Sequence, residues 1–186
     1  DVRRRASINY WSLADGEYSP GYQDTRGYFL RKYSARAGYS VSGERSLNYS
    51  NNMRIYRYAE TLLNYAELVG VLGATASGGV TPQNCLDLVR TRAGVASIPV
   101  NQDNIEKERH REFIGEGKRY WDLIRWGKAA QTLTENFSQP SFTGSGSESV
   151  FTWKRTWTEK SKYLPIPREE VDPRLGTDFE IIQNLY

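Results

Sequence analysis

Three acidic residues near the middle of the chain have the residue types that acid–base chemistry requires. Glu112, Glu116 and Asp122 lie close together in the sequence, and two carboxyl groups that flank a glycosidic bond can hydrolyse it. Each acid, however, has an arginine three residues away; these arginines are Arg109, Arg119 and Arg125. A carboxylate that is paired with a cation is a poor proton donor. We therefore predict a structural ion-pair network here, no catalytic residue, and a protein that is not an enzyme.

The chain has one histidine, His110, and one cysteine, Cys85. An ordinary zinc site needs more ligands of these types, so we predict no metal site and no cofactor. His110 lies in a charged run and is expected on a solvated helix face, because no serine or cysteine nucleophile has a recognisable setting near it. Cys85 is expected to be a small buried apolar residue, and it has no second cysteine with which to form a disulfide.

Aromatic residues are frequent, with 13 Tyr, 5 Trp and 6 Phe. Several of those near the N-terminus lie in polar stretches without helical period, where flat amphipathic rings suit a surface that binds a partly apolar, partly hydroxylated ligand. Sugars fit this description and so do protein partners, while loop aromatics also pack against neighbouring segments. The candidate ligand-binding residues are Tyr10, Trp11, Tyr18 and Tyr22.

Two helices with a short connection form the clearest element of the predicted fold. Residues 53–69 repeat apolar side chains at helical spacing, and these are Ile55, Ala59, Leu62, Ala66 and Val69. The opposite face carries Arg57, Glu60, Asn64 and Glu67. Thr81 and Pro82 have the residue types of an N-cap and a first helical position, and Gly94 suits the end of that helix. The pair predicts an antiparallel hairpin that resembles one tetratricopeptide unit.

A long third helix is expected from Asp103 or Asn104 to Ala130, and Gly115 and Gly117 weaken it. Its aromatic residues, and those of the first helix, are expected in the core; they are Tyr58, Tyr65, Trp121 and Trp126. The rest of the chain reads as irregular, with a short strand near 28–33, a flexible stretch at 138–149, a β-prone stretch at 150–157 and one helical turn at 168–171. The predicted fold is mostly α, with extensive loops and little strand.

Charge and hydropathy exclude two classes of partner. Lys and Arg total 25 and Asp and Glu total 22, so the net charge is +3, which is too mild to indicate a nucleic-acid or lipid-surface partner. The longest apolar stretch, from Leu68 to Ala74, is too short to span a bilayer. No signal peptide opens the sequence, so we expect either that a leader has been removed or that the natural chain starts earlier.

Several longer motifs follow one another along the chain. They are R-Y-A-E-x-x-L-N-Y-A-E over 57–67, V-R-x-R-A-G over 89–94, E-R-x-x-E-F-x-x-E-G-x-R-x-W-D-L-x-R-W-G over 108–127, Y-L-P-I-P over 163–167, and Q-N at 183–184. Together they resemble the motifs of the SusD/RagB family. The opening Asp1-Val2-Arg3 is similar to the family's D-P-R, and Leu185 stands where the family has a proline.

The resemblance covers residues 1–186 and implies the C-terminal half of such a protein, as a single domain or a fragment of one. The family's N-terminal half, which holds the lipidated cysteine and most of the tetratricopeptide-like helices, is absent; Cys85 lies mid-sequence and is not that cysteine. The implied function is that of a lipid-anchored protein of the outer-membrane surface. It would bind oligosaccharide or another nutrient and deliver it to a SusC-type TonB-dependent transporter, with no nucleic-acid partner and with its own N-terminal half as a further partner.

Two other functions remain open from the residues alone. The first is a tetratricopeptide-like module that binds a protein or peptide and no sugar, and a screen against glycans and peptides distinguishes it. The second, more distant, is a glycoside hydrolase, which turnover of an oligosaccharide would support.

Overall fold

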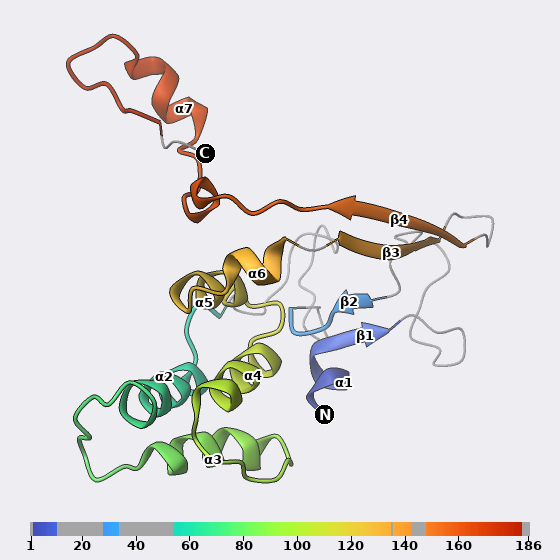
Figure 1. The fold of residues 1–186 in the computed structure, drawn as a ribbon, viewed down its shortest axis with the longest axis vertical. Coiled ribbons are helices and arrows are strands. Elements are labelled where there is room, and N and C mark those ends of the chain that lie inside the picture. The colour runs from blue at the N-terminus through green and yellow to red at the C-terminus, as the bar shows by residue number, and fades with distance from the viewer. Residues whose placement is uncertain (1, 11–27, 34–53, 135, 143–147, 184–186) are drawn as a thin grey trace, which may run out of the picture. The chain divides into compact units, whose positions relative to one another are not determined.

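The computed structural model describes residues 2–10, 28–33, 54–134, 136–142 and 148–183. The helices are α1 (Arg3–Ser7), α2 (Tyr58–Gly70), α3 (Pro82–Arg92), α4 (Gln102–Glu112), α5 (Arg119–Arg125), α6 (Ala129–Leu133) and α7 (Arg168–Val171), with 3₁₀ turns η1 (Glu159–Lys162) and η2 (Asp172–Arg174). The strands are β1 (Ile8–Tyr10), β2 (Tyr28–Leu30), β3 (Asn136–Phe142) and β4 (Glu148–Lys154). The described part is thus mostly helical with little strand, as predicted (Figure 1). None of its helices combines the length and apolar character that crossing a membrane requires.

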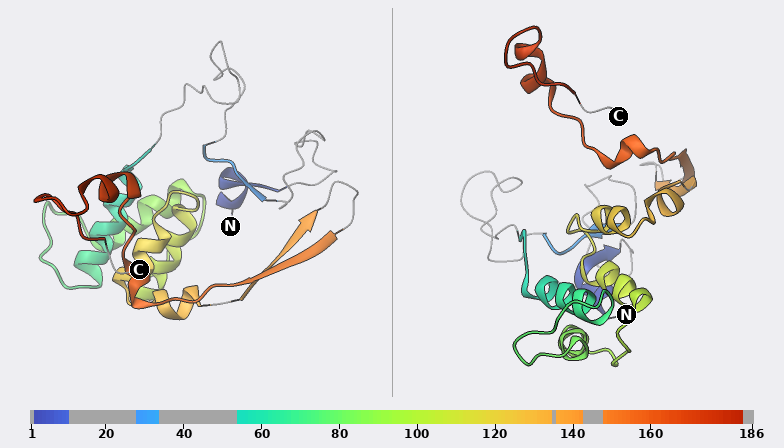
Figure 2. Two further views of the ribbon diagram at one scale, coloured as in Figure 1. Left: turned by 90° about the horizontal axis from the view of Figure 1, so that it is seen from above. Right: turned by 60° about the vertical axis from the view of Figure 1, so that its left-hand side comes forward.

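The chain divides into two compact units. The first contains α1, the β1–β2 ribbon and α2–α4, and the second begins at Tyr120 and contains α6, β3, β4 and the C-terminal turns. In the first unit α2, α3 and α4 lie side by side, as all views in Figure 1 and Figure 2 show. The predicted helical hairpin is therefore present as α2 and α3.

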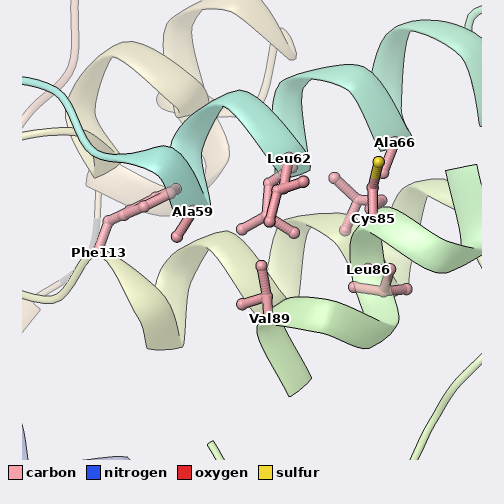
Figure 3. Close-up of a cluster of buried hydrophobic side chains, with 9 residues drawn as sticks. Ala59, Leu62, Ala66, Cys85, Leu86, Val89 and Phe113 are labelled. Atoms are coloured by element: carbon pink, nitrogen blue, oxygen red, sulfur yellow. The ribbon is translucent and has the colours of Figure 1, made fainter. Parts of the chain in front are cut away.

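The hairpin buries an apolar core between α2, α3 and α4 (Figure 3). Its members are Ala59, Leu62, Leu63, Ala66, Cys85, Leu86, Val89, Ile105 and Phe113. Cys85 is buried, as predicted, and burial raises the pKa of its thiol. The Thr81 hydroxyl accepts a hydrogen bond from the Asn84 backbone N–H at 3.1 Å, which confirms the predicted N-cap of α3.

The first helix starts later than the apolar period suggests. Arg57 has extended backbone angles and α2 begins at Tyr58, so Ile55 lies outside the helix and is exposed. Tyr58, predicted in the core, is 71% exposed. Glu60, predicted on the polar face, is buried and pairs with Lys118 at 3.1 Å. The apolar period predicts the helix. It does not reveal that Glu60 is buried, because the ion pair with Lys118 is not visible in the spacing.

The predicted long third helix is wrong, because the chain turns after Glu112. Gly115 and Gly117 have φ values of +75° and +72°, a left-handed conformation that glycine adopts readily and that ends an α-helix. The region therefore forms α4, α5 and α6 as separate helices. Phe113 remains buried, whereas Trp121 is 49% exposed, because the turn breaks the register that placed both rings on one face. Trp121→Ala should accordingly cost less stability than the truncation of a buried tryptophan.

In the second unit, part of the stretch predicted to be flexible, 138–149, is strand, and β4 confirms the β-prone character predicted for 150–157 over residues 150–154. Residues 136–142 and 148–154 pair as β3 and β4, because backbone pairing supplies hydrogen bonds that composition does not reveal. The predicted helical turn at 168–171 is present as α7. Gln183 joins the C-terminal end of the described chain to the Y-L-P-I-P motif. Its side-chain oxygen accepts from the Ile166 N–H at 2.8 Å, and its side-chain amide donates to the Ile166 carbonyl at 2.7 Å. Pro165 and Pro167 have no N–H to offer, so Ile166 is the one of these three residues that can both donate to and accept from the Gln183 amide.

Candidate functional site

The four candidate ligand-binding residues begin at the end of the ribbon. Tyr10 is the last residue of β1 and pairs with Tyr28 of β2, in the antiparallel register that also pairs Ile8 with Leu30. Trp11, Tyr18 and Tyr22 lie outside the described residues, in the segment that joins the two strands. Tyr10 is therefore the last described residue before that segment.

The ribbon is anchored to the turn between α4 and α5. The Arg31 N–H donates to the Ser7 carbonyl at 2.9 Å, which extends the pairing beyond β2. A methyl group built on Gly115 would lie 2.1 Å from Leu30 Cδ1, so the Leu30 side chain packs directly against the glycine backbone. The absence of a side chain at Gly115 thus allows β2 to approach the turn.

This close approach predicts unequal effects for two neighbouring glycines. Gly115→Ala and Gly117→Ala both place an L-residue at positive φ, which costs about 1–2 kcal/mol, but nothing lies within 4 Å of a Cβ built at Gly117. We expect Gly115→Ala to lower the free energy of unfolding by more, because Leu30 must also move. Urea denaturation of both variants measures the difference, and equal losses would show that Leu30 relaxes freely.

Three glutamates at four-residue spacing form the charged centre of the first unit, and we call Glu108, Glu112 and Glu116 the glutamate cluster. Glu108 has 0% exposure. Arg3 Nη1 lies 2.5 Å from Glu108 Oε1, and Arg90 Nη1 lies 2.6 Å from Glu108 Oε2. The carboxylate therefore holds α1 and α3 against α4.

Glu112 has three arginine partners from different parts of the chain. Its Oε1 lies 2.5 Å from Arg92 Nη2 and 3.0 Å from Arg57 Nη1, and its Oε2 lies 3.3 Å from Arg3 Nη1. A buried carboxylate is stabilised only where cations and donors replace its water. The convergence of these arginines explains how Glu112 is accommodated inside the unit.

Glu116 accepts a two-pronged bond from Arg57: the guanidinium Nε and Nη2 lie 2.8 Å from Oε2 and Oε1. Such paired geometry is among the stronger charged contacts. Lys32 Nζ lies 2.6 Å from the same carboxylate and also donates to the Glu112 backbone carbonyl. Arg57 in addition lies over the Phe113 ring, 5.3 Å from its centroid.

Electrostatics keep this pair ionised. Burial by itself raises the pKa of the Glu116 carboxyl, but hydrogen bonds and charge from Arg57 and Lys32 outweigh it and hold the pKa below its ordinary 4.5. Burial lowers the pKa of Arg57, yet Glu116 and Glu112 outweigh that effect and raise it. Glu116 is thus a poor proton donor, which agrees with the structural role predicted for these acids.

The depressed pKa of Glu116 predicts a pH effect on stability. Because its folded pKa lies below the unfolded value, Glu116 contributes stability above about pH 4.5, and that contribution is lost as the pH falls through the folded pKa. We expect the melting temperature of Glu116→Gln to fall less steeply than that of the parent on acidification. Melting curves from about pH 7 to pH 3 measure this, and parallel curves would contradict it.

The predicted ion pairs are only partly those observed. Asp122 Oδ1 lies 2.9 Å from Arg125 Nη2, as the three-residue spacing suggested. Glu112 and Glu116, in contrast, use Arg3, Lys32, Arg57 and Arg92, which sequence reasoning did not assign to them. Arg109 donates to Asn64 Oδ1 at 2.6 Å. One feature of the sequence does indicate these partners: Arg3, Arg57 and Arg92 each lie within one of the motifs shared with the SusD/RagB family.

A cavity of about 320 Å³ opens beside these ion pairs. Its lining comes from α1, the residues after β2, the segment before α2, the ends of α3 and α4, and the turn after α4. It consists of Arg3, Ala6, Ser7, Lys32, Arg54, Arg57, Arg92, Glu112 and Glu116. His110 is exposed on α4, as predicted. Across the described ranges, no group of three or more His, Cys, Asp or Glu side chains could hold a metal ion.

Residues 3–184 match the model of the SusD family. No curated protein matches the chain. Surface glycan-binding protein A from Bacteroides fluxus is 45% identical with a TM-score of 0.77, and the match covers 99% of this chain and 37% of that one. Surface glycan-binding protein A from Bacteroides thetaiotaomicron, solved in complex with laminarihexaose, is 42% identical with a TM-score of 0.73 and coverages of 100% and 38%.

A laminarin-binding SusD-like protein is 36% identical with a TM-score of 0.69, and the match covers 99% of this chain and 35% of that one. The chain therefore spans 35–38% of the length of these three structures. The matches confirm the predicted SusD-like fold and family resemblance.

Proposed function

Since the chain belongs to the SusD family, we propose that it forms part of a cell-surface protein that binds oligosaccharide. Members of this family bind their ligands without catalysing a reaction. The observation that carries the proposal is similarity along nearly the whole chain to proteins named as glycan-binding, at 45% and 42% identity. The ion-paired acids of the glutamate cluster, which suit structure better than proton transfer, also support a binding protein.

Within this proposal the ligand is a laminarin-type oligosaccharide. One relative is solved with laminarihexaose, and another is named as laminarin-binding. The protein would be attached to the outer membrane by a lipid on a segment outside this chain. It would pass its ligand to a SusC-type TonB-dependent transporter, and the rest of the protein, on the N-terminal side, would complete the structure.

The proposed contact residues are Tyr10, Trp11, Tyr18 and Tyr22. An aromatic ring stacked on a sugar contributes on the order of 1 kcal/mol, which is about a fivefold change in affinity. We expect Trp11→Ala and Tyr18→Ala each to weaken laminarihexaose binding by about this factor, and the double variant to weaken it further. Calorimetry on the full-length protein measures the affinities.

Tyr58→Ala serves as the matched control, because Tyr58 is an exposed aromatic residue on α2 and outside the candidate segment. It should leave the affinity unchanged. A double variant that folds normally and binds as tightly as the parent would place the contacts elsewhere. Binding of peptides and of no glycan would instead favour the tetratricopeptide-like interaction module.

A further inference from the structure

The cavity beside the glutamate cluster carries more positive than negative charge. Its lining contains two carboxylates, those of Glu112 and Glu116, and five cations. The cations are Arg3, Lys32, Arg54, Arg57 and Arg92. Outside this lining, Glu108 binds Arg3 and Arg90, and because Glu108 and Arg90 balance each other, an excess of three positive charges remains. Among the described residues, the acids that contact these cations therefore leave the charge of the cavity unbalanced.

The cations of the lining differ in how many of their hydrogen-bond donors are already used. Arg57 donates to Glu112 and Glu116 from all three of its nitrogens, and Lys32 donates to the Glu116 carboxylate and the Glu112 carbonyl.

The other two arginines retain most of their donors. Arg92 donates through Nη2 to Glu112 at 2.5 Å. In the part of the chain that the structure describes, no side-chain hydrogen bond or ion pair involves Arg54. Since a guanidinium has five N–H donors, Arg54 and Arg92 can bind a further group of opposite charge.

Burial places these two arginines where a ligand from solvent can reach them. Arg54 is exposed and the Arg92 side chain is 59% exposed, whereas the side chains of Arg3, Lys32 and Arg57 are at most 20% exposed. The inner positive charges act on an entering anion with less screening by water. A volume of about 320 Å³ holds a tetrahedral oxyanion together with several waters, since one water occupies about 30 Å³.

We propose that this cavity binds a small doubly charged oxyanion, such as sulfate or phosphate, through the guanidinium groups of Arg54 and Arg92. The planar donor fork of arginine matches pairs of oxygens on such an anion, and the charge of the anion offsets most of the excess in the lining. The inference goes beyond glycan binding and does not depend on it. Laminarihexaose carries no charge, so its binding is a separate measurement, and neither result of the anion test alters the proposed function.

The test is calorimetric titration of the full-length protein with sodium sulfate, with sodium chloride at the same ionic strength as the reference. Sulfate stabilises folded proteins in general by its exclusion from their surface, so the heat of a saturable binding step is measured and not the melting temperature. We expect one site for sulfate and none for chloride. Arg54→Gln and Arg92→Gln should each weaken sulfate binding by about tenfold, as expected for the loss of a charged hydrogen-bond donor.

Arg54→Gln is the decisive variant, because Arg54 precedes α2 and its replacement breaks no described side-chain contact, so the variant should fold normally. Arg111→Gln is the matched control: it removes the same charge from an exposed position on α4 that does not line the cavity, and it should leave the sulfate affinity unchanged.

Three results would overturn the inference. The first is parent-like sulfate affinity in both Arg54→Gln and Arg92→Gln. The second is equal weakening by Arg111→Gln, which would attribute binding to net charge. The third is a parent protein without saturable sulfate binding, the outcome expected if an acidic side chain from the rest of the protein fills the cavity.

Discussion

Replacing Glu108 by glutamine is expected to lower the free energy of unfolding by about 3–5 kcal/mol, the usual cost of removing one partner from a buried ion pair. Glu108 has 0% exposure and lies between Arg3 and Arg90, at 2.5 and 2.6 Å. Glutamine keeps the shape and one acceptor oxygen but removes the charge, which leaves two buried guanidinium groups without their shared counter-ion. Urea denaturation of the variant measures the loss.

Asp103→Asn provides a control on the same helix. Asp103 pairs with Lys107 at 2.5 Å, but both side chains are exposed, and such pairs contribute under about 1 kcal/mol. The two substitutions make the same chemical change at opposite extremes of burial. A loss below about 1 kcal/mol for Glu108→Gln would indicate that water reaches the pair and that α1 does not depend on it.

Local signals in the sequence were sufficient to predict the helical hairpin of α2 and α3. Its helices have a continuous apolar period, and α3 has a side-chain cap at Thr81 followed by Pro82. These features depend on residues three or four positions apart, which the sequence displays directly. The apolar period therefore identifies Ala59, Leu62 and Ala66 as core residues, although it also places the exposed Ile55 on the same face.

The charged site depends on contacts that no local rule reveals. Spacing suggested partners three residues away from Glu112 and Glu116, yet their observed cations include residues separated from them by 55 to 109 positions. Those contacts exist because the chain turns at Gly115 and Gly117 and brings α1, Lys32 and Arg57 to one place. The period of the expected third helix continued across these glycines, so the turn and the site that it creates were missed together.

The second large effect is expected in the apolar core, where Leu86→Ala should destabilise the protein by about 2–5 kcal/mol through lost burial and a residual cavity. Leu86 is fully buried in α3 and faces α2 and α4 as part of the cluster in Figure 3. Leu88→Ala on the same helix is the control, because Leu88 is 54% exposed and a surface truncation of this kind usually changes stability by under about 0.5 kcal/mol. Urea denaturation of both variants tests the register of α3. Similar losses for both would show that a further surface covers Leu88 in the full-length protein.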